Sequence, residues 1–194
     1  MPRGLNKEAI LEAGLALMYD RGFHASGIQE IANASGVPKG SFYNHFKSKE
    51  DFAVQALERY TERAAAHLQA TLIEGQGSPI ERLRRVLDDW SENQFSTNRG
   101  RGCFAANLSM EIANHSPIIR EALGKSLTKL ESFFQSCLKE AKASGEIGPE
   151  VDVRPLASFL YDALHGSFMR AKAEGKTEPA TRFRDFVFTT LLAR

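Results

Sequence analysis

A short cationic segment, residues 36–49, carries the side chains in this sequence that are best suited to bind a polyanion. It reads GVPKGSFYNHFKSK, and residues 32–49 contain three lysines and no aspartate or glutamate. Lys39 and Tyr43 stand four positions apart, so in a helix they lie on one face. A face that offers ammonium, hydroxyl and amide groups without competing carboxylates suits phosphate oxygens. The segment therefore predicts contact with the backbone of a nucleic acid.

Two aromatic rings are expected to anchor this segment from behind. Phe42 and Phe46 are also four positions apart, on a different face from Lys39. We expect both rings to pack into a small core with Ile31 and Leu17. The segment is then an amphipathic helix whose polar face stays outside.

The chain around this segment has the pattern of short helices separated by glycine. Apolar residues at helical spacing over residues 10–18 predict a first helix. The stretch DRGFHASG interrupts it, and Ser26 is expected to N-cap a second, short helix. Gly36 marks a tight turn, and Pro38 stands in the first turn of a third helix, where its missing N–H costs nothing. Two short helices joined by a tight turn, the second of them basic, predict a helix-turn-helix.

The rest of the sequence also has helical period and shows no alternating strand pattern. Ser48 with Asp51, and Ser78 with Glu81, have the spacing of capping boxes at the starts of two longer helices. Later helices are expected over residues 103–113, 117–143, 152–174 and 178–194. The predicted fold class is all-α, with a three-helix head over residues 1–50 and a larger helical bundle over residues 51–194.

Composition and charge limit which classes of protein this sequence can belong to. The 194 residues carry a formal net charge of +1, so any nucleic-acid surface must be local rather than spread over the whole protein. No apolar run is long enough to span a membrane, and the N-terminus has no apolar signal core. The two cysteines fit a reducing cytoplasm better than a disulfide framework. We expect a cytoplasmic protein with no metal and no cofactor.

On the DNA-binding interpretation, the polar residues of the head have different expected roles. Gly40 removes a side chain where the backbone must come close to DNA, while aromatic, imidazole and ammonium groups contact phosphate and shorter polar groups reach base edges. The phosphate candidates are Tyr43, His45 and Lys49, and the base-edge candidates are Gln29, Lys39, Ser41 and Asn44. The full candidate set is Ser26, Gly27, Gln29, Lys39, Gly40, Ser41, Tyr43, Asn44, His45 and Lys49. The alternative is that these are ordinary solvated polar residues on a small helix.

These residues resemble the DNA-binding head of the tetracycline-repressor (TetR) family. The family's pattern is matched here by Ile31-Ala32, Gly36-Val37, Lys39-Gly40, Tyr43 with Phe46, and Lys49, and GLALMYDRGF resembles the family's first helix. The resemblance covers about the first 55 residues. Gly27 departs from it, because the family often has Ser or Thr there; the backbone amide can still meet a phosphate, but a hydroxyl contact is lost.

The resemblance implies a homodimeric transcriptional regulator, usually a repressor, that binds double-stranded operator DNA. Its C-terminal bundle would bind a small-molecule effector and change the spacing of the two heads, which must be about 34–36 Å apart to enter successive major grooves. The last two helices would form a four-helix dimer interface. Its candidates are two helical stripes, Leu160, Leu164, Ser167 and Phe168 on the first helix and Phe183, Phe186, Val187 and Leu191 on the second. These stripes could instead simply complete the core of the monomer.

Cys103 is the candidate for redox or electrophile sensing. It is expected at the start of a helix, close in sequence to Arg99 and Arg101, and both features favour a thiolate. The surrounding sequence GC…NL…E resembles the NemR-like branch of the family, in which the cysteine at this place senses electrophiles or oxidants. The alternative is a structural cysteine that packs a turn. Cys137 falls on an apolar stripe and is interpreted as an inert buried thiol.

The effector pocket is expected to be mostly apolar with a few polar groups. By resemblance, its candidate residues are Cys103, Trp90, Phe95, Phe104, Asn107 and His165. Each of them could equally be part of the core. An enzyme is not expected, because the five histidines show no metal-ligand spacing and no nucleophile motif is present. The other function that the sequence allows is a helical ligand-binding or protein-interaction module that does not bind DNA.

Overall fold

The computed structural model describes residues 3–96 and 100–192. They form two compact units. The first consists of the chain up to Glu62 together with Phe104–Leu127, and the second consists of Arg63–Cys103 together with the chain from Thr128 onward. The predicted functional division at residue 50 does not coincide with these units and stays a prediction.

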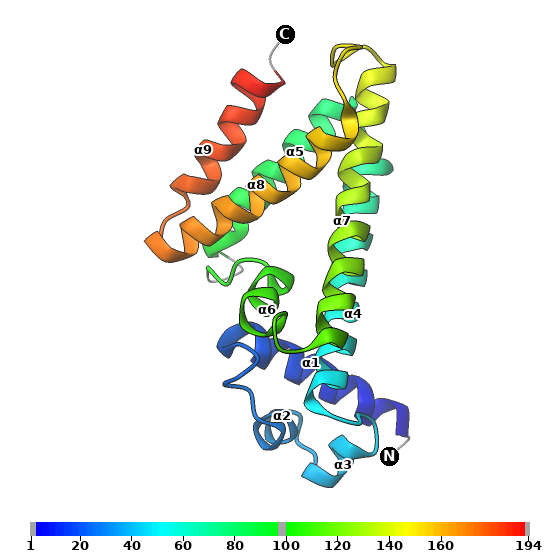
Figure 1. Ribbon diagram of the computed structural model, residues 1–194, viewed down its shortest axis with the longest axis vertical. Coiled ribbons are helices and arrows are strands. Elements are labelled where there is room, and N and C mark those ends of the chain that lie inside the picture. The colour runs from blue at the N-terminus through cyan, green and yellow to red at the C-terminus, as the bar shows by residue number, and fades with distance from the viewer. Residues whose placement is uncertain (1–2, 97–99, 193–194) are drawn as a thin grey trace. The chain divides into compact units, whose positions relative to one another are not determined.

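All regular elements of the described residues are helices, as the sequence predicts (Figure 1). Two of the helices end in a short π-helical stretch. No described helix is long and apolar enough to cross a membrane. In chain order the helices are α1 (Arg3–Arg21), α2 (Ile28–Ala34), α3 (Lys39–Tyr43), α4 (Lys49–Leu68) continued by η1 (Gln69–Ile73), α5 (Pro79–Ser96), α6 (Phe104–Ile112), α7 (Pro117–Ala143), α8 (Val153–Glu174), and α9 (Glu178–Phe186) continued by η2 (Val187–Leu191).

Three phenylalanine rings form the centre of the head. Phe42, Phe46 and Phe52 are all fully or almost fully buried, with ring centroids 4.9–5.5 Å apart. Gly14 on α1 makes room for this cluster, since a Cβ there would lie 2.3 Å from Cζ of Phe52. The expected anchoring of Phe42 and Phe46 is confirmed, but Leu17 is only half-buried, because α1 turns a neighbouring stripe of its surface inward.

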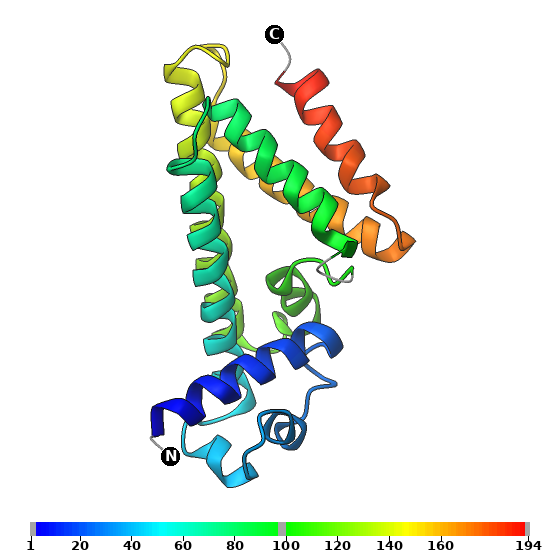
Figure 2. The same cartoon turned by 180° about the vertical axis from the view of Figure 1, so that it is seen from behind.

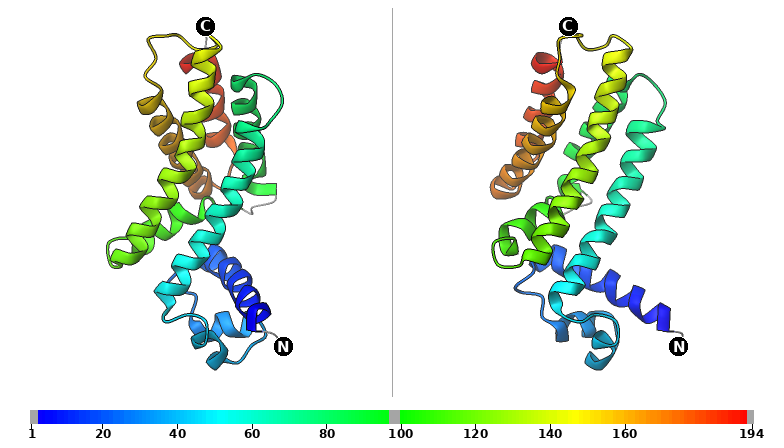
Figure 3. Two further views of the ribbon diagram at one scale, coloured as in Figure 1. Left: turned by 90° about the vertical axis from the view of Figure 1, so that its right-hand side faces the viewer. Right: turned by 45° about the vertical axis from the view of Figure 1, so that its right-hand side comes forward.

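The turn between α2 and α3 has the predicted glycine geometry. Gly36 has φ +69°, a conformation that side chains other than glycine rarely adopt, and the N–H of Val37 donates to the carbonyl of Ala32 at 3.0 Å. Pro38 is the N-cap of α3, one position earlier than expected. In Figure 3, α2 and α3 (light blue) form a short pair, and both pack against α1.

The predicted helix starts of α4 and α5 are confirmed. The N–H of Asp51 donates to Oγ of Ser48 at 3.0 Å, although the Asp51 carboxylate accepts from the N–H of Lys47 rather than of Ser48. At α5 the box is reciprocal: Ser78 N–H donates to Glu81 Oε2 at 2.8 Å, and Glu81 N–H donates to Ser78 Oγ.

The second unit is a helical bundle in which α9 packs against both α8 and α5 (Figure 2). Trp90, Phe134, Tyr161 and Phe168 make successive ring contacts in its core. Cys137 is fully buried, its thiol donates to the carbonyl of Pro79 at 3.2 Å, and burial raises its pKa to about 11. The prediction that Cys137 is buried in the core is confirmed.

The stripe Leu160, Leu164 and Phe168 is also buried inside this unit. These three residues complete the core of the monomer, so the expectation that they lie in a dimer interface is wrong. A different face of α8 is exposed, and it carries Phe159 and Met169.

Candidate nucleic-acid interface and thiol site

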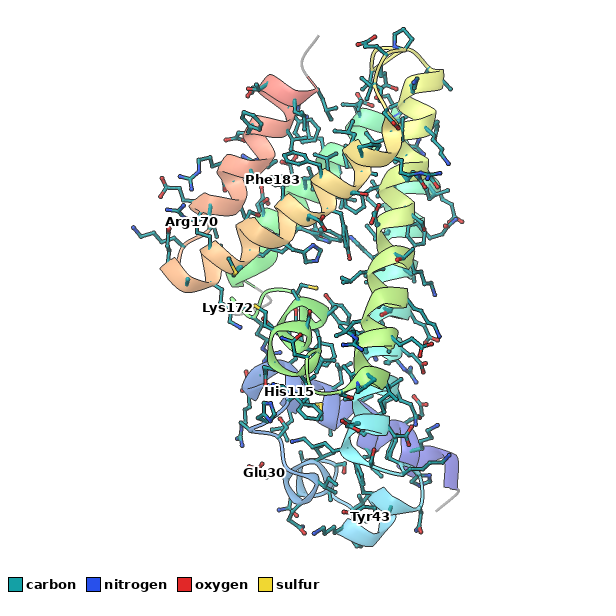
Figure 4. The ribbon with its side chains drawn as sticks, in the orientation of Figure 1. Glu30, Tyr43, His115, Arg170, Lys172 and Phe183 are labelled. Carbon is teal, nitrogen blue, oxygen red and sulfur yellow. The ribbon has the colours of Figure 1, made fainter. Side chains whose placement is uncertain are left out.

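Helix α3 presents its polar face outward, as the sequence predicts. Lys39, Gly40, Asn44 and Tyr43 are exposed, and Tyr43 retains 53% of its surface. Figure 4 shows Tyr43 on α3 of the head. Phe42, on the opposite face, is fully buried. The amphipathic orientation leaves an ammonium group, a phenol and an amide free to meet phosphate and base edges.

Gly40 has no structural reason within the protein to be glycine. It lies in a helix without a positive φ, and a Cβ at this position would meet nothing within 4 Å. Glycine in a helix is less favourable than alanine by up to about 1 kcal/mol. A requirement for glycine at position 40 would therefore come from a binding partner. A DNA backbone that lies close to α3 would leave no room for a side chain there.

The other candidate DNA-contact residues differ in how exposed they are and in whether their polar groups are already hydrogen-bonded within the protein. Gln29 on α2 is exposed, and its Nε2 donates to Oδ1 of Asn33 at 2.8 Å. Ser41 and His45 are half-buried, so each offers only part of its side chain to a ligand. Gly27 is the N-cap of α2, and its N–H donates to Oε2 of Glu30 at 2.8 Å, so this amide is satisfied within the protein.

The structure corrects the two predictions made for Ser26. It does not cap α2; the cap is Gly27. The Ser26 side chain is fully buried, and its hydroxyl donates to the carbonyl of Gly22 at 2.7 Å. A hydroxyl that closes the α1–α2 loop from inside cannot reach a phosphate, so the prediction that Ser26 contacts DNA is wrong for its side chain.

The ammonium group of Lys49 is engaged inside the head. Its Nζ donates to the carbonyl of His24 at 3.4 Å and lies 4.5 Å from the centre of the Phe23 ring. Burial lowers the pKa of Lys49, against the opposing influence of the Glu111 and Glu30 carboxylates. A phosphate contact by Lys49 would require its ammonium to leave this position, and the predicted contact stays a prediction.

Glu111 on α6 also contacts the α1–α2 loop, and no spacing in the sequence predicts this contact. Its Oε2 accepts the N–H of His24 at 3.2 Å, and its own carbonyl lies 3.3 Å from Nε2 of His24. Gly22 has φ +85°, and a Cβ there would lie 2.4 Å from Oε1 of Glu111. Helix α6 therefore contributes a carboxylate to the loop that leads into α2.

The structure brings Cys103 and His165 together within the second unit. Cys103 is buried and directly precedes α6, and its side chain is hydrogen-bonded to the imidazole of His165. Nδ1 of His165 lies 2.7 Å from the carbonyl oxygen of Tyr161, and the two rings are 4.4 Å apart. Both residues are candidates from the sequence alone, but nothing in their spacing indicates that they pair.

The pKa of His165 is raised above its ordinary value. Burial acts to lower this pKa, but the hydrogen bond to Cys103, the charge of a Cys103 thiolate, the carbonyl of Tyr161 and the Asp162 carboxylate together outweigh it. Burial, followed by the charges of Cys103, Glu131 and Asp162, raises the pKa of Tyr161 far above its ordinary value. The imidazole therefore holds its proton more tightly than an ordinary histidine does.

The remaining effector candidates are spread over the two units. Trp90 is half-buried against Phe134 and Phe168, whereas Phe104 packs between Tyr19 and Tyr60 in the first unit. Asn107 is half-buried in the first unit. The side chain of Phe95 and all of Arg99 lie outside the described residues, while Arg101 is half-buried. A single pocket that joins these residues stays a prediction.

The fold and this face define a helix-turn-helix DNA-binding protein with a helical C-terminal part. Two family models match the chain: that of bacterial regulatory proteins of the tetR family over residues 10–56, and that of the tetracyclin repressor-like C-terminal domain over residues 79–187. The chain therefore belongs to the TetR family of transcriptional regulators, which is a family of DNA-binding proteins rather than enzymes.

Individual relatives cover nearly the whole chain. The HTH-type transcriptional repressor DhaR of Mycobacterium sp. (strain GP1) is 33% identical over 192 residues, which is 99% of this chain and 95% of DhaR. The HTH-type transcriptional repressor NemR of Escherichia coli (strain K12) is 29% identical over 174 residues, 89% of this chain and 87% of NemR. The crystal structure of the reduced form of E. coli NemR has a TM-score of 0.84 at 28% identity, covering 94% of this chain and 95% of that one. The family resemblance seen in the sequence is confirmed.

Proposed function

We propose that the protein is a homodimeric repressor that binds operator DNA through α2 and α3 and is released by a small molecule or an electrophile. The observation that carries this proposal is the outward face of α3, where Lys39, Tyr43 and Asn44 are exposed over buried phenylalanines. DhaR and NemR, which are named repressors, align with nearly the whole chain. The protein would act in the cytoplasm, where its DNA is.

The test is an electrophoretic mobility shift with the DNA upstream of the protein's own gene, at low and moderate salt. We expect sequence-selective retardation that weakens as salt rises, because binding releases counterions from phosphate. Lys39→Ala and Tyr43→Ala should each weaken binding by at least about tenfold, since each removes a contact in both halves of a dimer. Lys139→Ala, which removes an exposed lysine of α7 in the second unit, is the matched control and should leave binding unchanged.

The alternative function, a helical interaction module without DNA binding, makes the opposite prediction. It is supported if no upstream fragment is retarded, or if Lys39→Ala and Lys139→Ala have equal effects. In that case the α3 face is an ordinary solvated surface.

The homodimer part of the proposal rests on apolar side chains that the bundle leaves exposed. Phe159 and Met169 on α8 retain 51% and 57% of their surface, and Phe186 on α9 retains 51%. Gly166 lies on the same face of α8 as Phe159 and Met169, and a Cβ there would meet nothing within 4 Å, so another helix could approach closely. A second copy of the chain would cover this face.

The oligomeric state can be measured by size-exclusion chromatography with light scattering. Phe159→Glu combined with Phe186→Glu should convert a dimer to a monomer, because it places charges in an apolar contact. Met110→Glu changes an exposed methionine of α6 and is the control. A wild-type monomer, or a dimer that survives the double substitution, rules this interface out.

A further inference from the structure

We propose that Lys49 positions the helix-turn-helix from inside the head, and that Lys47, two residues earlier, is the lysine that contacts phosphate at this end of α3. This reverses the expectation from the sequence, in which Lys49 is the phosphate candidate. The inference rests on the proposed function, because it assigns roles in DNA binding. Both residues carry the same charge at nearly the same place in the chain, so the surroundings of their ammonium groups decide between them.

The ammonium group of Lys49 has an internal site in the head. It donates to the carbonyl of His24 at 3.4 Å and lies over the Phe23 ring, 4.5 Å from its centre. Phe23 retains only 7% of its surface, so this ring is part of the core. Glu30 and Glu111 attract the ammonium, and Lys49 as a whole is half-buried. Lys49 is the first residue of α4, so these contacts connect the start of α4 to the α1–α2 loop.

The side chain of Lys47 has different surroundings. It is exposed, and it lies in the short connection between α3 and α4, directly after the buried Phe46. The backbone N–H of Lys47 donates to Oδ2 of Asp51 at 2.8 Å, and Oδ1 of Asp51 accepts from Nε2 of Gln55 at 3.1 Å. Both oxygens of this carboxylate are therefore hydrogen-bonded by groups other than the Lys47 ammonium. The backbone is held in place at Lys47 while its side chain stays exposed.

The free energy of DNA binding favours the exposed lysine. An ammonium group that meets a phosphate releases condensed counterions from the DNA, and this gain is the same for either lysine. Lys49 would first have to leave the His24 carbonyl and the Phe23 ring, and a cation–π contact alone changes an equilibrium constant by about two- to fivefold. Lys47 has no comparable contact with the described residues to give up. Lys47 therefore makes the phosphate contact, and Lys49 remains in its internal site.

From its internal site, Lys49 acts on DNA binding through the α1–α2 loop. That loop ends at Gly27, the N-cap of α2. The carbonyl of His24 in the loop accepts from Lys49 on α4, and the N–H of the same residue donates to Glu111 on α6. Two different helices therefore hold the two backbone groups of one loop residue. Without the Lys49 ammonium the loop is looser, and the entropy lost in ordering it again reduces the affinity for DNA.

The experiment measures the salt dependence of binding by the full chain to an upstream DNA fragment that wild type retards. Each phosphate contact contributes about 0.9 to the magnitude of the slope of log affinity against log salt concentration. Lys47→Gln should reduce this magnitude by about 1.8, because a dimer loses the contact in both halves. Lys49→Gln should leave the slope unchanged and lower the affinity per folded molecule by about fivefold at every salt concentration. Lys139→Gln, which changes an exposed lysine of α7 in the second unit, is the control and should alter neither quantity.

A conservative variant and a measurement without DNA separate positioning from general stability. Lys49→Arg keeps a cation that can donate to the His24 carbonyl and lie over Phe23, so its affinity should stay within about twofold of wild type. Hydrogen exchange of the His24 amide should be faster in Lys49→Gln than in wild type, and unchanged in Lys49→Arg. If Lys49→Gln lowers only the free energy of unfolding, with the affinity per folded molecule unchanged, the positioning role is wrong.

The slopes can also overturn the inference directly. A smaller slope in Lys49→Gln shows that Lys49 contacts phosphate, and an unchanged slope in Lys47→Gln shows that Lys47 does not. If wild type retards no DNA fragment, the proposed function fails and the phosphate role of Lys47 fails with it. Exchange of the His24 amide still tests the internal site of Lys49 in that case, so the two failures are distinguishable.

Discussion

Oε2 of Glu111 accepts a hydrogen bond of 3.2 Å from the backbone N–H of His24, 87 positions earlier in the chain. This contact joins α6, which follows directly on Cys103, to the loop that leads into the first helix of the helix-turn-helix. Gly22, whose φ is +85°, leaves the space that the carboxylate occupies. A shift of α6 would therefore act on the α1–α2 loop through a direct polar contact.

Glu111→Ala should loosen that loop. Loss of the carboxylate leaves the His24 N–H without this acceptor and should lower the free energy of unfolding by about 1–2 kcal/mol. DNA affinity should fall by up to about tenfold, because the loosened loop must be ordered again on binding. Thermal melts and mobility shifts measure the two effects. Glu121→Ala, which removes an exposed carboxylate of α7 in the same unit, should change neither, and equal effects of the two variants would contradict this prediction.

Gly40→Ala should separate stability from DNA binding. The new methyl group meets nothing in the protein, so the helix gains up to about 1 kcal/mol of stability from alanine's higher propensity. The same methyl group would stand between α3 and a DNA backbone, so affinity should fall.

Gly124→Ala is the matched control for this prediction. Gly124 lies within α7, is exposed, and also has open space where a Cβ would lie. The Gly124→Ala variant should be more stable than wild type, with no change in its affinity for DNA. If Gly40→Ala binds DNA as wild type does, Gly40 is not a contact position.

Ser26→Ala should be a stability variant rather than a DNA-contact variant. The buried hydroxyl donates to the Gly22 carbonyl, and its loss should lower the free energy of unfolding by about 1–2 kcal/mol. Urea unfolding gives this value, and DNA affinity per folded molecule should stay within about twofold of wild type. A large loss of affinity at full folding would restore Ser26 as a contact residue.

The protonation of His165 should depend on Cys103. The pKa of His165 is raised above its usual value of about 6.5, so the folded state binds this proton more tightly than the unfolded state does. The resulting stability is fully present below about pH 6.5 and is lost as the pH rises through the folded-state pKa.

Cys103→Ser should move the pKa of His165 downward, and it should reduce this pH dependence. The charge and hydrogen bond of the thiolate are lost, while the burial that lowers the pKa remains. Titration of the imidazole proton signals by NMR measures the change. A His165 pKa that is the same in both proteins would show that the thiolate does not act on it.

Local structure was largely predictable from the sequence. The boxes at Ser48 and Ser78, the glycine turn at Gly36 and the two faces of α3 all involve residues within five positions of one another. At such separations, the geometry of a helix or turn fixes which groups meet. The N-cap prediction for Ser26 was wrong, because its hydroxyl is buried and donates to the carbonyl of Gly22, and α2 begins after Gly27 instead.

The pairs that connect distant parts of the chain were decided by tertiary structure alone. Cys103 and His165 were each named from the sequence, but their contact depends on how the α8 helix packs beside the segment of the second unit that ends at Cys103, which no spacing encodes. The same holds for Glu111 and His24, and for the face of α8 that carries Phe159, because an apolar stripe does not reveal which of its neighbours covers it. Helical period determines which side chains share a face, whereas the packing of whole helices determines what each face meets.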